Sequence, residues 1–449
     1  AAISPVAAQT RSRQPHIIYI VSDDQGWKDV GFNGADIATP NIDALAASGA
    51  RLEQFYVLPM CTPTRAALLT GRYPFRYGLQ TGVIPSGGSY GLALDEWLLP
   101  QTLKEAGYRT AIVGKWHVGH AKTEYWPIQR GFDSFYGALV GEIDHFKHES
   151  HGVTDWYRDN KLLKEDGYDT ELFGDEAVRI IANHDTKVPL FLYLAFTAPH
   201  TPYQAPQEYL DKYAHVPDEN RRAYCAQITA MDDQIGRVIA EIDKRGMRDD
   251  TLIVFHTDNG GTRSSLFAGE SAVKGGLPPD NGPFRSGKGT LYEGGTRASA
   301  VVNWPGTVPV GTVSGMVHVV DMYPTLTRLG GGSSEKAKPL DGIDVWNYVT
   351  GRTPSPRHEV VYNVEPFQAA VRENDWKLIW VPMLPGSLEL FDLSKDPSEL
   401  TNLASANPDK VSSLKTRIEG LARQAQQPLL VAEMIRMTFG APPSTPRAQ

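Results

Sequence analysis

Four apolar segments of this chain end in side chains that could bind a metal ion or move a proton. The segment "HIIYIVSDD" ends in Asp23 and Asp24, and "TLIVFHTDNGG" contains Asp258 and Asn259 near its end. The segments "RTAIVGKWH" and "PLFLYLAFTAPH" end in three further groups of this kind: Lys115, His117 and His200. Two adjacent carboxylates repel each other unless a cation or hydrogen-bond donors lie between them. These residue types therefore indicate a polar site built from the ends of strands.

The carboxylate and amide side chains predict a hard cation. Asp23, Asp24, Asp258 and Asn259 offer oxygen atoms only, which suits calcium or magnesium and not zinc. The alternative is that both pairs are ordinary loop starts, because Asp, Asn and Gly all favour turns. Two such pairs, each at the end of an apolar strand, favour the metal interpretation.

Cationic and titratable groups accompany these oxygen donors. Arg65, Lys115 and Lys288 carry positive charge, and His117 and His200 can exchange protons near neutral pH. Each residue alone is explained more simply as part of a surface loop or turn. Fixed positive groups beside a divalent cation are suited to a multiply oxygenated anion, such as a sulfate or phosphate ester.

Cys61 lies at the start of a predicted helix in "PMCTPTRAALLTGRYP". Thr62 can cap this helix, Pro63 fits its first position and Gly71 ends it. A helix N-terminus favours an anion, because its N–H groups are free and its dipole is positive there. Three hypotheses remain for Cys61. It could be a buried packing residue, a thiolate nucleophile, or a thiol converted to an aldehyde whose hydrate binds the cation and attacks the substrate.

The elements that carry these residues predict an α/β fold. Continuous β-branched and aromatic segments are typical of strands buried on both faces of a parallel sheet. Helical patterns lie between them, at residues 41–49 and 223–246. Strands that alternate with helices indicate a mostly parallel sheet flanked by helices. Ligands bind outside the carboxyl ends of such strands, so the four polar ends should converge on one site.

A second domain is expected after residue 350. A chain of 449 residues exceeds the roughly 250–300 residues at which single cores stop growing. Beyond residue 351, short apolar runs joined by turns predict a small antiparallel sheet, followed by a helix at about residues 407–426. The chain therefore divides into a catalytic domain, residues 1–350, and a smaller C-terminal domain, residues 351–449. Its last ten residues, "GAPPSTPRAQ", are expected to form a loose tail.

Composition excludes several classes of protein. The net charge of -8 argues against general nucleic-acid binding. No apolar run reaches the ~20 residues that a membrane helix requires. The first residues, "AAISPVAAQTRSRQ", look like the start of a mature chain after removal of a signal peptide, which predicts a periplasmic or secreted protein. Oligomeric state stays open.

Two motifs carry a resemblance to a known family. "CTPTR" at residues 61–65, followed by "LTGR" at 69–72, resembles the signature of the formylglycine-dependent (type I) sulfatases. "GYRT" through "GKWH", residues 107–117, resembles their second signature, and the likeness covers nearly the whole chain. Within the family the chain looks closest to arylsulfatase B and its bacterial relatives. The resemblance implies an alkaline-phosphatase-like fold and hydrolysis of a sulfate monoester, an aryl sulfate or a sulfated sugar, to alcohol and sulfate.

The resemblance also implies how the metal and the nucleophile are supplied. Cys61 would be oxidised to formylglycine by a formylglycine-generating enzyme. Calcium, with magnesium less favoured, would be bound by the modified Cys61 and four further residues: Asp23, Asp24, Asp258 and Asn259. The fourth position of the motif is often serine in this family, whereas Thr64 stands here and keeps the hydroxyl group.

The remaining roles follow from the same resemblance. Arg65 would steady the aldehyde hydrate, and Lys115 and Lys288 would hold the sulfate oxygens. His117 would take the proton whose loss returns the sulfated hydrate to the aldehyde. His200 would lie near the leaving oxygen and share a proton-donor role with Lys288.

Three other functions remain as alternatives. They are a phosphate or phosphonate monoester hydrolase on the same fold, a catalytically silent carbohydrate-binding relative, and a thiol enzyme that uses unmodified Cys61. Specificity is expected in the Gly- and Pro-rich segment 262–285, which should rim the pocket, and in residues 141–159. Five residues of the latter segment could meet a sugar ring or simply form a surface loop: His145, His148, His151, Trp156 and Tyr157.

Overall fold

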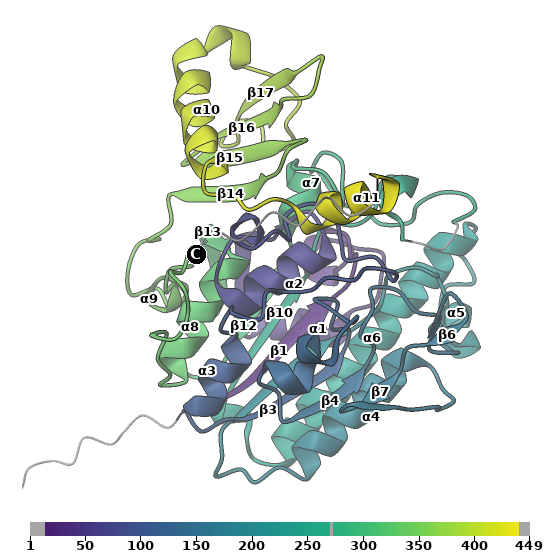
Figure 1. Ribbon diagram of the computed structural model, residues 1–449. Helices are drawn as coiled ribbons and strands as arrows, with labels where there is room; N and C mark the ends of the chain where they lie inside the picture. The colour runs from purple at the N-terminus through teal and green to yellow at the C-terminus, as the bar shows by residue number, and fades with distance from the viewer. Residues whose placement is uncertain (1–13, 270–272, 440–449) are drawn as a thin grey trace, which may run out of the picture.

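A computed structural model describes residues 14–269 and 273–439, and its centre is a mixed eleven-stranded sheet (Figure 1). The strand order is β11-β2-β12-β10-β1-β9-β3-β4-β7-β8, and β13 pairs with β2. The bounds are β1 (His16–Ser22), β2 (Ala50–Tyr56), β3 (Arg109–Gly114), β4 (Ser134–Gly137), β7 (Tyr157–Arg158), β8 (Lys161–Leu162), β9 (Leu190–Ala195), β10 (Thr251–Thr257), β11 (Arg297–Ala298), β12 (Ala300–Asn303) and β13 (Gly311–His318). Strands β10, β1, β9, β3 and β4 run parallel, as the sequence predicted.

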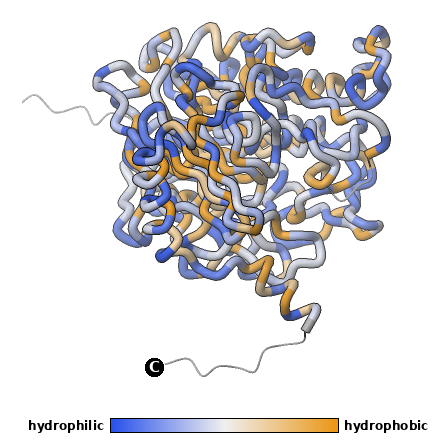
Figure 2. Tube along the Cα trace, turned by 90° about the horizontal axis from the view of Figure 1, so that it is seen from above, coloured by the Kyte–Doolittle hydropathy of each residue, from blue (hydrophilic) through white to orange (hydrophobic). Residues whose placement is uncertain are grey.

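The four apolar segments are the four neighbouring strands β10, β1, β9 and β3. All residues of β1, β9 and β10 are buried, which explains why these segments are apolar without interruption. Ser22 at the end of β1 pairs with Thr257, and Ala195 at the end of β9 pairs with Gly114. The polar residues that follow these strands therefore start from one edge of the sheet. In Figure 2 apolar stretches gather in the middle of the molecule and hydrophilic ones in the outer loops.

Helices cover both faces of the sheet. Alternate residues of β1 take part in two hydrophobic clusters, Ile17 and Tyr19 in one, Ile18 and Ile20 in the other. The first cluster contains α2 (Cys61–Thr70), α3 (Leu99–Glu105) and α8 (Met322–Leu329), and the second contains α1 (Pro40–Ala47), α4 (Asp169–Ala182) and α6 (Glu219–Lys244). Shorter helices are α5 (Gln207–Lys212), α7 (Glu293–Thr296) and α9 (Trp346–Val349). No described helix is both long and apolar enough to cross a membrane.

A small antiparallel sheet follows, as predicted (Figure 1). Its strands are β14 (Glu359–Val364), β15 (Ala369–Glu373), β16 (Trp376–Val381) and β17 (Ser387–Asp392), and α10 (Pro408–Ala422) comes after them. Buried residues of this sheet, such as Val361 and Leu378, belong to the same hydrophobic cluster as one face of the large sheet. The two sheets thus share a core. A domain boundary at residue 350 stays a prediction.

The chain then returns to the larger sheet through a helix that the sequence analysis did not predict, α11 (Leu429–Phe439). The Gln426 N–H donates to Phe75 O (2.8 Å) and the Leu429 N–H to Gly78 O (2.9 Å). Glu433 accepts a hydrogen bond from the N–H of Ser89 (3.1 Å). The predicted loose tail, residues 440–449, lies outside the described residues.

A buried ion cluster joins the small sheet to the segment after Lys288. The Lys377 ammonium lies 3.0 Å from Glu293 and 2.7 Å from Glu399, and all three side chains are buried. Burial opposes ionisation of Glu293, but Lys377 and Arg297 outweigh it and lower its pKa to about 2. Burial raises the pKa of Glu399 to about 7. One ammonium thus lies between two buried carboxylates, and Arg297 adds a second positive charge 3.6 Å from Glu293.

Replacing Lys377 should destabilise the fold. Lys377→Met removes the ammonium that the two buried carboxylates share, a change that costs about 3–5 kcal/mol when a buried pair is broken. Urea unfolding measures the effect. Lys395→Met is the matched control, because the Lys395 side chain is exposed to solvent where it pairs with Asp392, and it should leave the midpoint unchanged. Equal midpoints for both variants would show that the buried cluster does not stabilise the fold.

Candidate active site

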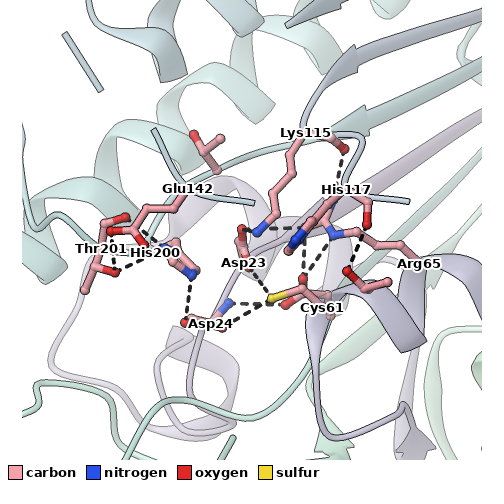
Figure 3. A network of polar contacts seen from close by, with 12 residues as sticks. Asp23, Asp24, Cys61, Arg65, Lys115, His117, Glu142, His200 and Thr201 are labelled. Atoms are coloured by element: carbon pink, nitrogen blue, oxygen red, sulfur yellow. Dashed lines mark hydrogen bonds and ion pairs between the residues drawn. The ribbon is translucent and has the colours of Figure 1, made fainter. Parts of the chain in front are cut away.

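The polar ends of the four strands meet at the start of α2 (Figure 3). One ligand atom from each of four buried residues lies within 4.8 Å of the others: Asp23, Asp24, Cys61 and His200. Asp258 and Asn259 adjoin this group, because Asp258 Oδ1 accepts from the Asp24 N–H (3.3 Å) and Asn259 Nδ2 donates to Asp24 Oδ1 (2.8 Å). The structure therefore brings together all five residues that the sequence analysis expected at the metal, with His200 beside them.

The donor set fits a hard divalent cation. Asn259 Oδ1 is buried and has no hydrogen-bond partner among the described residues. A buried acceptor without a partner is costly unless an ion or water satisfies it. Burial and the neighbouring Asp23 charge raise the pKa of Asp258 to about 7, the direction expected for crowded carboxylates. A cation among these oxygens would relieve both costs.

Three basic side chains balance the three carboxylates. Arg65 Nη2 lies 2.9 Å from Asp258 Oδ2, and Arg65 Nη1 donates to the Lys115 carbonyl (3.1 Å). The Lys115 ammonium binds a second carboxylate, that of Asp23. Burial opposes ionisation of Asp23, yet Lys115 and the other cations hold its pKa well below its ordinary value.

The third ammonium lies on the opposite side of the carboxylates. Lys288 Nζ is 2.8 Å from Asp24 Oδ2, and the Thr262 hydroxyl donates to the same oxygen (3.1 Å). Burial lowers the pKa of Lys288, but Asp24 outweighs it and the net shift is upward, so Lys288 stays charged. A divalent cation added to this balanced set would leave an excess of positive charge, which suits an anionic substrate.

His117 is held with one ring nitrogen available. Its Nε2 lies 3.0 Å from the Ile84 carbonyl and must donate to it, so Nδ1 carries the lone pair and has no partner among the described residues. Burial and the Lys115 charge hold the pKa of His117 well below its ordinary value. The ring packs on Gly141, where a Cβ would lie 2.2 Å from a ring carbon, so a larger residue would displace it. His117 is a neutral imidazole that can accept a proton.

His200 faces Lys288. Its Nδ1 lies 2.8 Å from the Thr201 carbonyl, which assigns the proton to Nδ1 and leaves Nε2 as an acceptor 3.4 Å from Lys288 Nζ. Burial lowers the pKa of His200 below its ordinary value. An ammonium and an imidazole in contact can pass a proton to an oxygen placed between them.

The Cys61 thiol is buried against the carboxylates. Its Sγ lies 3.3 Å from Asp23 Oδ1 and 3.9 Å from Asp24 Oδ1. Burial and the Asp23 charge raise the pKa of this thiol well above its ordinary value, so unmodified Cys61 stays protonated despite its place at the helix N-terminus. This state disfavours the hypothesis of a thiolate nucleophile.

The start of α2 differs from the prediction. The helix begins at Cys61, its N-cap is Met60, and no side chain caps it, so the expectation that Thr62 would cap the helix is wrong. The Thr62 hydroxyl instead donates to the His117 carbonyl (2.9 Å) and so fastens that loop to the helix. The Thr64 hydroxyl bonds both the N–H and the carbonyl of Leu58 (3.0 and 3.1 Å). Gly71 ends the helix with φ 67°, as predicted.

A cavity of about 170 Å³ opens over these groups. Besides Cys61, His117, His200 and Lys288, the lining residues include Met60, Val83, Ile84, Ser86, Gly141, Glu142, Ser150, Leu266, Phe267 and Gly269. The last three come from the Gly- and Pro-rich segment, so the prediction that this segment rims the pocket is confirmed for its described part. Residues 270–272 lie outside the description.

Residues 141–159 differ in part from the interpretation as a sugar-contacting loop. His145 is buried behind His200: its Nδ1 lies 2.9 Å from Asp169 and its Nε2 3.1 Å from the His200 carbonyl. His148 stacks on the buried Trp156 at 4.1 Å, so neither ring reaches the catalytic cavity. Packing, not substrate contact, explains His145, His148 and Trp156, whereas Gly141, Glu142 and Ser150 of the same segment line the cavity.

Glu142 and Thr262 lie within the two segments in which specificity was expected, but neither residue was singled out. Glu142 lines the cavity, and Thr262 binds Asp24. Thr262 stands three residues after Asn259, a spacing that could have drawn attention to it. Val83, Ile84 and Ser86 lie in a loop without any sequence signal of function.

Comparison with known proteins decides the family. A family model described as sulfatase matches residues 15–332, and one described as N-sulphoglucosamine sulphohydrolase, C-terminal, matches residues 285–424. The chain belongs to the sulfatase family. It is 36% identical to arylsulfatase J of Mus musculus over 94% of this chain and 78% of that protein.

Two further similar proteins match almost the whole chain. The N-acetylgalactosamine-6-sulfatase of Homo sapiens is 29% identical over 95% of this chain and 88% of its own length. The crystal structure of Ps i-CgsB in complex with k-i-k-neocarrahexaose is 33% identical, has a TM-score of 0.83 and covers 92% of this chain and 94% of that one. This sulfatase is thus an enzyme that hydrolyses sulfate esters on an alkaline-phosphatase-like fold. The nearer likeness to arylsulfatase B stays a prediction.

Because Cys61 is buried, we predict that its thiol is unreactive in folded protein expressed without the formylglycine-generating enzyme. Folded protein should not react with iodoacetamide at Cys61, because the thiol is buried and protonated, and the reaction should appear on unfolding. Mass spectrometry of the labelled peptides measures this, with an added Ser413→Cys on the exposed side of α10 as the reactive control. Labelling of folded Cys61 at the rate of the control would restore the thiol hypothesis.

Proposed function

We propose that this sulfatase cleaves a sulfate monoester with a formylglycine hydrate made from Cys61, beside a calcium ion. Five residues would hold the ion: Asp23, Asp24, Asp258, Asn259 and the modified Cys61. The observation that carries the proposal is the buried Asn259 Oδ1, which no described residue partners and which lies among three carboxylates near the first residue of α2. Calcium is favoured over magnesium because it accepts several carboxylate and amide oxygens without demanding octahedral geometry.

The hydrated aldehyde would supply a hydroxyl that attacks sulfur and a second hydroxyl whose deprotonation expels sulfate, and the ion would supply positive charge at the sulfate oxygens. Lys115 and Lys288 would bind those oxygens as charge moves onto the leaving group, and their contacts with Asp23 and Asp24 support this role. The neutral His117 would take the proton of the second hydroxyl at Nδ1.

Proton delivery to the leaving oxygen falls to the other side of the cavity. Lys288 stays charged and lies against the acceptor nitrogen of His200, so this pair can donate a proton to the departing alcohol. Arg65 would hold Asp258 and the Lys115 carbonyl in place and so steady the hydrate region.

The substrate class we propose is a sulfated carbohydrate. Ps i-CgsB was crystallised with a carrahexaose, and other similar proteins are named for N-acetylgalactosamine 6-sulfate hydrolysis, which supports a sugar here. The apolar wall of Val83, Ile84 and Phe267 can pack against a sugar or aryl ring. A formylglycine-generating enzyme as maturation partner and a location outside the cytoplasm stay predictions.

Cys61→Ser tests the nucleophile. A serine can be sulfated but has no second hydroxyl through which to expel sulfate, so this variant should lose turnover of 4-nitrophenyl sulfate by about three orders of magnitude or more and accumulate sulfated enzyme. Active wild type should show a mass at the Cys61 peptide that matches exchange of the thiol for an aldehyde.

The same assays weigh the alternatives. Wild type should turn over 4-nitrophenyl sulfate faster than the matched phosphate and phosphonate esters. Full turnover by Cys61→Ser would contradict the formylglycine mechanism. A preference for the phosphonate ester would favour the alternative of a phosphonate monoester hydrolase.

Calcium removal should lower both stability and activity. A chelator leaves three buried carboxylates and Asn259 Oδ1 without the ion, so the melting temperature should fall and calcium should restore it better than magnesium. Asn259→Ala should reduce the calcium-dependent shift, whereas Asn160→Ala, on an exposed turn, should keep it. A melting temperature that does not respond to calcium in wild type would contradict the assignment.

A further inference from the structure

A second cavity continues the catalytic one on the side of Glu142. This outer cavity has a volume of about 370 Å³ and shares Glu142 and Ser150 with the catalytic cavity. The rest of its lining is Ile143, Asp144, Lys147, Glu149, His151, Gly152, Pro202 and Gln204. Part of it is a short hairpin of β5 (Glu149–Ser150) and β6 (Val153–Thr154). A substrate larger than one ring would pass from the first cavity into the second at Glu142.

The Glu142 carboxylate lies on the leaving-group side of the site (Figure 3). The Thr201 hydroxyl is 3.4 Å from Glu142 Oε1, and Thr201 directly follows His200, whose Nε2 faces Lys288. A Cβ added to Gly269 would lie 2.5 Å from Glu142 Oε2, so the pocket rim closes against this carboxylate. The atoms next to the ester oxygen of a bound substrate would therefore meet Glu142.

The charge of Glu142 is opposite to that of Lys115 and Lys288, which we propose bind the sulfate oxygens. Among the described residues that line the catalytic cavity, Glu142 is the one carboxylate. The outer cavity adds Asp144 and Glu149 against a single lysine, Lys147.

Asp144 keeps its charge. Burial opposes ionisation, but hydrogen bonds from Gln204 and from the N–H groups of Phe146 and Lys147 outweigh it and lower the pKa of Asp144. The outer cavity is therefore net negative, whereas Lys115 and Lys288, which we propose bind the sulfate, are positive.

We propose that Glu142 is a specificity-determining residue of this sulfatase. Its carboxylate accepts a hydrogen bond from a hydroxyl or amide N–H group beside the sulfate ester and disfavours a second anionic group at that place. The preferred substrate is then a sugar that carries one sulfate next to a free donor. The inference rests on the proposed function and adds to it the chemistry of the neighbouring substituent.

Kinetics on matched sugars test this assignment. The substrates are 4-nitrophenyl sulfate and the 4-sulfate, 6-sulfate and 4,6-disulfate of N-acetylgalactosamine. Wild type should show a kcat/KM about ten-fold higher or more for its better monosulfate than for the disulfate, because like charges repel at short range. Glu142→Gln should reduce this ratio to about two-fold, chiefly through a lower KM for the disulfate.

A control variant and a salt series keep the test decisive. Glu208→Gln, on the exposed side of α5, makes the same chemical change away from both cavities and should keep the wild-type ratio. The ratio for wild type should also shrink as salt is raised from about 0.05 to 0.5 M, since screening weakens partly exposed charges. This second measurement does not depend on the variant folding.

The outcomes separate the two proposals. A wild-type ratio near one, or an unchanged ratio in a folded Glu142→Gln, overturns the role of Glu142. Hydrolysis of 4-nitrophenyl sulfate without hydrolysis of either monosulfate also overturns it, while the sulfatase mechanism stands. Failure on every ester, with Cys61 fully converted, contradicts the proposed function itself.

Discussion

The site depends on a balance of buried charges at the ends of the parallel strands. Three buried carboxylates, those of Asp23, Asp24 and Asp258, contact three basic side chains. The Oδ1 atom of Asn259 has no hydrogen-bond partner among the described residues. Burying a lone charge costs several kcal/mol, so each carboxylate is tolerable only because a cationic neighbour lies within hydrogen-bond distance. The balance explains why the charged side chains come from different elements: the carboxylates follow β1 and β10, whereas the bases lie after β3, on α2 and in the loop before α7.

Backbone geometry fixes this balance at two points. Asp24 has φ 61° and His117 φ 56°, a left-handed conformation that residues with a Cβ rarely adopt. Asp24 directly follows Asp23, and His117 lies two residues after Lys115, the base that pairs with Asp23. The unusual turn lets adjacent side chains point into the site together, and the surrounding hydrogen bonds, such as Thr62 to the His117 carbonyl, maintain it.

Much of this arrangement could be predicted because strand ends are local signals. Uninterrupted apolar segments identified β1, β3, β9 and β10, and parallel pairing then required their polar ends to converge. The sequences of the loops indicated less clearly which of their residues reach the site. Ile84 is held at the cavity by His117, 33 positions away in the sequence, and by the Thr62 hydroxyl, and His145 lies inward because Asp169 is its buried partner. Such contacts depend on tertiary neighbours, which periodicity and turn propensity do not describe.

The small C-terminal sheet also supports the site, because it holds the segment that carries Lys288. Glu399 accepts from the Glu293 N–H (2.6 Å), and Gln368 Nε2 donates to the Gly289 carbonyl (3.2 Å). Gly289 in turn donates to the carbonyl of Pro59, two residues before Cys61. A chain of hydrogen bonds thus runs from the C-terminal sheet through the Lys288 segment to the start of α2. Displacing that sheet would move an ammonium that balances Asp24, so the catalytic charges and the C-terminal packing form one structural unit.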